Sequence, residues 1–107
     1  MSFLPEELDG VVYCPGALKL MPFKRIKTEE FTSDFNLQVL GAINILQSVE
    51  PLLKKAVSPS VVLFSTVAVQ SGFNFHSLVS ASKGAIEGLT RALAAEFAPK
   101  IRVNCIA

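Results

Sequence analysis

Three short β-prone runs of apolar residues, separated by two long stretches of helical periodicity, constrain the fold of this chain more than any other feature. The runs cover residues 11–14, 60–64 and 101–106. The middle run is apolar at both alternating sets of positions, which is typical of a strand covered on both faces of a parallel sheet. The order is β-α-β-α-β, and each helix is long enough to cross over the sheet. The pattern therefore predicts an α/β fold with parallel strands and right-handed connections.

The first helix is expected over residues 28–55. Thr28 can cap the free backbone N–H groups, and the carboxylates of Glu29 and Glu30 suit the positive end of the helix dipole. Pro51 falls where the helix could kink or stop, before the basic pair at 54–55. Apolar residues recur every three or four positions in between, which indicates one buried stripe: Phe31, Phe35, Val39, Ala42, Ile43, Leu46 and Val49.

The second helix is expected over residues 78–97, ending before Pro99. Small side chains let another backbone come close, at some cost in helix propensity where they are glycines. One stripe of this helix is composed of such residues: Ala81, Gly84, Ala85, Gly88, Ala92 and Ala95.

This order of elements also predicts an incomplete sheet. If the three strands lie side by side in sequence order, both helices cover the same face, and the opposite face and the outer edge of the first strand stay bare. Residues 1–107 are therefore expected to form part of a doubly wound domain, without its first strands and its C-terminal segment.

Composition excludes several classes of protein. Half of the residues are hydrophobic, 18% are charged and the net charge is +1, so the chain is globular and lacks the basic patch of a nucleic-acid binder. No apolar run approaches the roughly 20 residues that span a bilayer, and the N-terminus does not resemble a signal peptide. Cys14 and Cys105 lack the spacing of metal ligands; free thiols in a reducing compartment fit better than a disulfide. We expect a cytoplasmic protein with no metal, nucleic-acid or membrane partner.

Residues 80–96, SASKGAIEGLTRALAAE, resemble the active-site helix of the short-chain dehydrogenases/reductases, which begins Tyr-x-Ala-Ser-Lys. Residues 101–104 resemble the strand that follows this helix in the family. Residues 8–16 resemble the strand with the Asn-Asn-Ala-Gly motif, and residues 64–68 resemble the strand end that bears the catalytic serine. Asn36, with Gly41 after it, resembles the family's mid-helix asparagine segment. The resemblance covers nearly the whole chain without a gap.

The resemblance implies a Rossmann-like domain that passes hydride between NAD or NADP and a small carbonyl or alcohol. In the family a tyrosine phenol transfers the proton, and a lysine four residues later, on the same side of the helix, holds the nicotinamide ribose. A serine orients the substrate oxygen, and an asparagine helps to hold water in a proton path.

Residue by residue, the resemblance assigns catalytic positions to Lys83, Asn36 and Thr66, with Ser65 beside Thr66 as a second candidate. Alternatives remain for each of them. Lys83 can instead pair with Glu87 one turn on, Asn36 can be a solvated helix residue, and the two hydroxyls can simply satisfy a strand end.

The cofactor-binding positions implied by the resemblance are Gly16, Pro15, Cys14 and Lys83. Gly16 matches the glycine that lets the cofactor lie against the chain. Tyr13, Cys14 and Pro15 depart from Asn-Asn-Ala, although much of that contact would be made by backbone.

Two departures leave catalysis open. Val79 occupies the tyrosine position and has no proton to give. There is also no glycine-rich turn after a first strand, so the pyrophosphate cradle is missing. His76, three residues before Val79, is a possible substitute acid or base, or else an ordinary loop histidine.

Two functions follow. In the first, the full-length parent is an NAD(P)-dependent oxidoreductase and this chain alone is inactive, with weak or absent cofactor binding. In the second, the protein is a non-catalytic scaffold of the same fold that serves oligomerisation. In both, the resemblance implies a homo-oligomer formed through helices 28–55 and 78–97.

Overall fold

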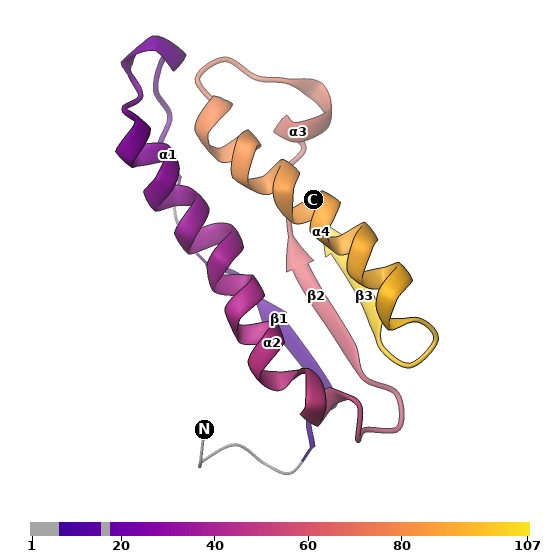
Figure 1. The fold of residues 1–107 in the computed structure, drawn as a ribbon. Helices are drawn as coiled ribbons and strands as arrows, with labels where there is room; N and C mark the ends of the chain where they lie inside the picture. The colour runs from indigo at the N-terminus through magenta and orange to yellow at the C-terminus, as the bar shows by residue number, and fades with distance from the viewer. Residues whose placement is uncertain (1–6, 16–17) are drawn as a thin grey trace.

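The computed structural model describes residues 7–15 and 18–107. Three strands and two long helical segments follow one another in the expected order, with short helices between them (Figure 1). The elements are β1 (Gly10–Tyr13), η1 (Phe23–Arg25), α1 (Thr28–Phe35), η2 (Asn36–Leu40), α2 (Gly41–Leu53), β2 (Ser60–Phe64), α3 (Ala68–Ser71), α4 (Ser77–Phe97) and β3 (Arg102–Ile106).

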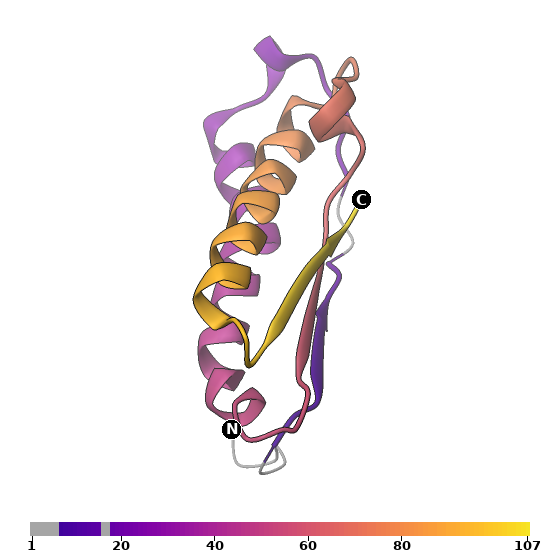
Figure 2. The same cartoon turned by 90° about the vertical axis from the view of Figure 1, so that its right-hand side faces the viewer.

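The three strands form one parallel sheet in the order β1-β2-β3, which confirms the predicted topology. Val61 in the central strand lies opposite Val11 on one side and Val103 on the other. Both long helical segments pack on the same face of this sheet, as Figure 2 shows. The carboxyl ends of all three strands therefore lie at one end of the molecule.

The core lies between the helices and the sheet. Val61 and Leu63 of β2 are fully buried, and they pack with residues such as Leu46 and Leu53 of α2 and Ile86 of α4. Alternate residues of a strand point to opposite faces. Val62 and Phe64 therefore point away from the helices.

That second face has no covering element among residues 7–15 and 18–107 (Figure 2). Val12 lies opposite Val62 in the register, and Ile106 lies opposite Phe64, so both share the uncovered face. Their exposed fractions are 66% and 52%, and we refer to these four apolar residues as the bare sheet face. The bare face expected from the sequence is present.

The start of α1 differs from the predicted cap. Thr28 is already helical and forms no cap with its side chain; Lys27 precedes the helix. The Glu30 carboxylate accepts the Lys27 backbone N–H at 3.2 Å and an ion pair from Lys19 Nζ at 2.6 Å. Because Glu30 reaches back to the free N–H, the threonine hydroxyl is not needed there. The hydrogen bond from Lys19, followed by that from Lys27, lowers the pKa of Glu30.

The first helical segment runs from Thr28 to Leu53 without a break in the helix, and one π turn, η2, separates α1 from α2. The Gly41 N–H closes this turn on the Asn36 carbonyl. Pro51 lies inside α2, and the helix ends at Leu53 rather than at residue 55. A proline so close to a helix end removes only one late hydrogen bond, so it does not stop the helix earlier.

In the described part of the chain, no helix has the length and hydropathy needed to cross a membrane.

Candidate active site at the carboxyl ends of the strands

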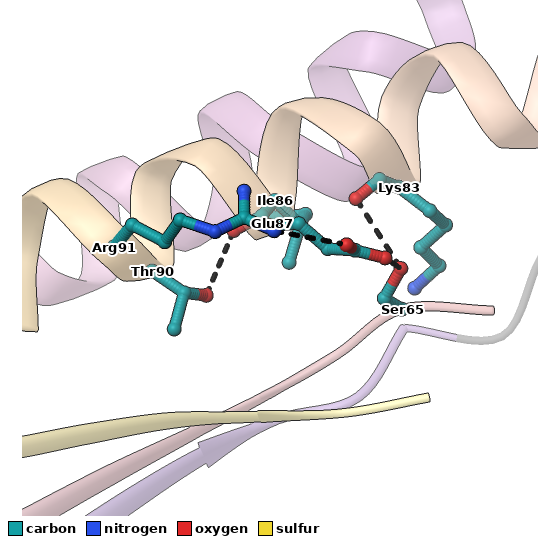
Figure 3. Close-up of polar contacts among 6 residues, drawn as sticks. All are labelled: Ser65, Lys83, Ile86, Glu87, Thr90 and Arg91. Atoms are coloured by element: carbon teal, nitrogen blue, oxygen red, sulfur yellow. Dashed lines mark hydrogen bonds and ion pairs between the residues drawn. The ribbon is translucent and has the colours of Figure 1, made fainter. Parts of the chain in front are cut away.

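Ser65, directly after β2, connects the sheet to α4. Its backbone N–H continues the ladder by donating to the Ile106 carbonyl at 2.8 Å. Its hydroxyl donates to the Glu87 carboxylate and lies 3.4 Å from the Lys83 backbone carbonyl (Figure 3). Glu87 in turn pairs with Arg91 at 3.6 Å. The strand end and one face of α4 are thus joined through side chains.

Lys83 is nearly inaccessible, with 9% of its surface exposed. Its side chain runs from α4 toward the strand ends (Figure 3). Glu87 is committed to Ser65 and Arg91, so the alternative pairing of Lys83 with Glu87 is not formed. Among the described residues, no hydrogen bond or ion pair reaches the Lys83 ammonium. A lysine that is 9% exposed, with its side chain at the carboxyl ends of the strands, is the strongest sign of a ligand position in this site.

Thr66, at the serine position of the resemblance, has a local role in the structure. Its hydroxyl oxygen accepts the Ala68 N–H at 3.4 Å, a long bond at the start of α3. The side chain is partly exposed at the same sheet end as Ser65. Both candidate hydroxyls thus follow β2, with Ser65 directed to α4 and Thr66 to the loop that follows.

Val79, at the tyrosine position, is 5% exposed and belongs to the packed interior of the chain. Its side chain cannot transfer a proton. The described residues place no tyrosine in its stead, because Tyr13 is directed elsewhere.

Among the described residues, no hydrogen bond joins the Asn36 side chain to Lys83. It is exposed at the first position of the π turn and lines a surface hollow together with residues of α1: Thr28, Glu29, Thr32 and Ser33. Its backbone carbonyl, by contrast, is used inside the helix by Gly41.

The cofactor positions that follow β1 are only partly described. Cys14 is exposed and Pro15 is partly buried at the carboxyl end of the strand. Gly16 lies outside the described residues. Cys14 and Pro15 thus lie at the same sheet end as Ser65 and Thr66.

His76 immediately precedes α4 and lies apart from the Ser65–Lys83 contact. It lines a cavity of about 480 Å³ together with Phe23, Phe73, Phe75 and Ser80. The structure therefore places this candidate acid or base among aromatic rings at the start of α4.

A second cavity, of about 330 Å³, opens between α4 and β3 and includes Ser65, Glu87, Thr90 and Cys105. Burial raises the pKa of the Cys105 thiol; the hydrogen bond with Thr90 works in the opposite direction, and the Glu87 carboxylate adds to the rise. Cys105 is therefore a thiol that stays protonated, whereas Cys14 is exposed; both are free.

Two residues of this region were missed by sequence reasoning. From the sequence, Glu87 is expected only as a partner for Lys83, although it also faces the strand end where Ser65 lies. Tyr13 was noted only as a departure from the motif. Its hydroxyl donates to the Leu37 carbonyl at 2.5 Å, inside the π turn. No local sequence signal predicts that contact, because the partners are 24 residues apart.

A parallel sheet with helices, whose strand ends meet a buried lysine on the following helix, defines an α/β protein of the Rossmann-like type. A family model described as Enoyl-(Acyl carrier protein) reductase matches residues 3–107. The chain belongs to the short-chain dehydrogenase/reductase family.

Curated relatives agree with this assignment. The chain is 36% identical to a tropinone reductase homolog of Arabidopsis thaliana over 106 residues, which are 98% of this chain and 40% of that protein. It is 36% identical to hydroxynaphthalene reductase of Aspergillus fumigatus, covering 94% of this chain and 36% of the relative. It is 34% identical to L-xylulose reductase of Bos taurus, covering 92% and 41%. The chain thus spans about two fifths of the length of these relatives.

Solved structures match with the same coverage. A short-chain dehydrogenase from Shigella flexneri superposes with a TM-score of 0.89 at 29% identity, over 94% of this chain and 40% of the other. A protein from Escherichia coli, assigned to the short-chain dehydrogenases and crystallised with NADPH, gives a TM-score of 0.90 at 28% identity, over 97% and 44%.

Proposed function

We propose that this chain is the active-site half of an oxidoreductase that, in its full-length form, transfers hydride between NAD(P) and a small carbonyl or alcohol. The observation that carries the proposal is Lys83, a lysine that is 9% exposed and lies beside the strand end that holds Ser65 and Thr66. The relatives named as reductases and the neighbour that binds NADPH support the same chemistry.

The residues fit a nicotinamide cofactor in part. The Lys83 ammonium offers three N–H donors to ribose hydroxyls, and the backbone at Cys14 and Pro15 offers an edge for the dinucleotide at the same sheet end. When bound, the cofactor supplies or accepts the hydride. The chain's own groups bind the cofactor and orient the substrate. The glycine-rich phosphate turn is absent, so we expect the isolated chain to bind NADH or NADPH weakly or not at all.

The proton has to come from a group other than residue 79. Thr66 and Ser65 supply hydroxyls at the strand end that can orient a substrate oxygen. His76, a water on the path to Lys83, or the substrate itself can then provide the proton. Of these three sources, His76 is the only side chain, and it is the only histidine of the sequence.

The test compares Lys83→Met with Lys24→Met, a change at an exposed lysine of η1, in the full-length protein. NADPH binding, followed by nicotinamide fluorescence, should weaken strongly in Lys83→Met and stay unchanged in Lys24→Met. Turnover with a panel of carbonyls should behave in the same way. Equal NADPH affinity in wild type and Lys83→Met would overturn the proposal.

A non-catalytic scaffold is the second candidate, and Val79 is the observation that favours it. In that case the full-length protein turns over none of the carbonyls, and Val79→Tyr creates activity. Turnover by the unmodified protein would exclude the scaffold.

For either function we propose a cytoplasmic homo-oligomer that does not bind nucleic acid or membrane. The small residues Ala81, Gly88 and Ala92 of α4 are exposed, and an apolar groove of about 340 Å³ runs between α2 and α4. A second copy of the chain packed on this surface would contact both the small residues of α4 and the groove between α2 and α4. Ala92→Glu should reduce the mass of the full-length assembly in light scattering, whereas Ser58→Glu, in an exposed turn, should not.

A further inference from the structure

The segment with η1 and the segment after α3 lie at the same end of the molecule (Figure 1), and aromatic side chains from both line one cavity. Phe23, Phe73 and Phe75 are 71%, 49% and 55% exposed, and all three line the cavity of about 480 Å³. Exposed aromatic surface is costly in water, and clusters of it commonly mark binding sites. The cavity volume lies within the range of about 300–1,000 Å³ that is usual for small-molecule sites.

Phe75 holds a backbone conformation that aromatic residues rarely adopt. Its φ is 64°, in the left-handed region that favours glycine. Its carbonyl accepts the Met21 N–H at 3.2 Å, which ties the segment after α3 to the segment before η1. The strained backbone of Phe75 thus holds its own ring at the cavity. Such strain tends to be retained where it serves a ligand.

His76 supplies a directed polar group among these rings. Its Nδ1 lies 2.7 Å from the Asn74 carbonyl, and a carbonyl only accepts, so Nδ1 carries the proton. In the neutral ring, Nε2 then has a free lone pair for a ligand hydroxyl. The imidazole also stands edge-on to Phe73, with ring centroids 5.4 Å apart and an interplanar angle of 78°. That contact fixes the ring orientation.

From these observations we propose that the cavity formed by Phe23, Phe73, Phe75 and His76 binds a flat aromatic ring that carries a hydroxyl or carbonyl oxygen. The phenyl rings provide faces and edges for stacking at the usual centroid distances of about 4.5–7 Å, and His76 takes the polar end. Aromatic ligand binding is a property of the chain itself. That the ring belongs to the substrate rests in addition on the proposed function.

The test measures saturation-transfer NMR signals of 2-naphthol on the 107-residue chain, a method that tolerates self-association of the protein. Cyclohexanol serves as the non-aromatic probe. Two variants are compared with wild type. Phe75→Gly removes the ring and relieves the positive φ, so it should melt at or above the temperature of wild type. Phe35→Ala removes a partly exposed ring of α1 that does not line the cavity.

We expect saturable binding of 2-naphthol, little binding of cyclohexanol, affinity about tenfold weaker in Phe75→Gly, and no change in Phe35→Ala. No saturable binding to wild type, equal binding of cyclohexanol, or equal loss in both variants would overturn the proposal. Lys83→Met separates the two proposals in this experiment. It should strongly weaken NADPH binding by the full-length protein and leave the naphthol signal of this chain unchanged.

Discussion

At the scale of single residues, the best-defined contact outside the core is the one between Tyr13 and the π turn. A π turn leaves a carbonyl without its usual helical partner, and the Tyr13 hydroxyl bonds such a carbonyl at Leu37. Gly41 makes room for it, because a Cβ there would lie 2.1 Å from the tyrosine oxygen. The position of the Tyr13 ring, the glycine at position 41 and the π turn thus depend on one another.

Gly41→Ala should therefore destabilise the fold by about 2 kcal/mol, since the added methyl group has to displace Tyr13. Tyr13→Phe should cost about 1 kcal/mol through the lost hydrogen bond. Gly88→Ala is the matched control in α4, where a Cβ meets nothing within 4 Å. It should stabilise by about 0.5–1 kcal/mol through helix propensity. Urea unfolding of the three variants measures all these changes, and a harmless Gly41→Ala would contradict the contact.

Lys83 and Lys100 should respond to substitution in opposite ways. Lys100 donates to the Ala56 carbonyl at 2.6 Å, so Lys100→Met should cost about 1 kcal/mol. Lys83→Met keeps most of the apolar stem of a lysine whose ammonium makes no hydrogen bond or ion pair among the described residues, so it should leave the free energy of unfolding unchanged or increased. A clear loss of stability in Lys83→Met would show that the ammonium has a structural role.

The two thiols should differ in reactivity. Cys14 is exposed, whereas burial raises the pKa of Cys105 and keeps it protonated. In Cys14→Ser and Cys105→Ser variants, Ellman's reagent should label Cys14 much faster near neutral pH. Since the folded pKa of Cys105 is raised, its contribution to stability is present below the ordinary thiol pKa and is lost as pH rises through the folded value. Equal labelling rates would contradict this assignment.

At the scale of elements, the sequence predicts regular structure well and its interruptions poorly. The central strand coincides with the run at 60–64, because a short apolar run that contains two valines is typical of a buried strand. The sequence does not predict the π turn at 36–40, because the turn is bonded by Tyr13, which lies in strand β1 and is distant in sequence. The sequence predicts Thr28 as the cap of α1, and this prediction is wrong. The Glu30 carboxylate accepts the Lys27 N–H instead, and that contact depends on the path of the backbone before the helix.

The cap of α1 should make the stability of this helix sensitive to acid. The folded pKa of Glu30 is lowered by Lys19 and then by the Lys27 N–H. Its contribution is therefore present above the ordinary carboxyl pKa and is lost as pH falls through the lowered folded value. Glu30→Gln should reduce the pH dependence of the melting temperature in this acid range, whereas Glu29→Gln should leave that dependence unchanged. Identical pH profiles for the two variants would argue against the cap.

At the scale of the whole molecule, the parallel three-stranded topology follows from the sequence, and so does the bare sheet face. The assignment of Ser65 and Lys83 to the candidate site comes from the resemblance and stays a prediction. The aromatic cavity was not, because it forms only where residues 21 and 75 meet across the fold. Side chains from distant loops come together through tertiary contacts that no local pattern records.

The bare sheet face leads to a prediction for the isolated chain. Two exposed apolar residues on it, Val12 and Ile106, should promote self-association. Sedimentation should show more than one copy per particle for wild type and a smaller particle for the double change Val12→Lys with Ile106→Lys. Val57→Lys, at a 96% exposed position outside the sheet, is the control. A wild-type monomer that unfolds cooperatively would contradict the prediction.

The parallel strands also divide the molecule into two ends that tolerate change differently. At the amino ends, Lys100 and Arg102 tie the neighbouring turns together through the Ala56 and Ser58 carbonyls. Random mutations there should be detected as poor expression. At the carboxyl ends, the loops carry the hydroxyls and aromatic rings and contribute little to the core. In a mutational scan that records abundance and ligand choice separately, the two phenotypes should segregate to opposite ends of the same strands, so new specificity can evolve without rebuilding the scaffold.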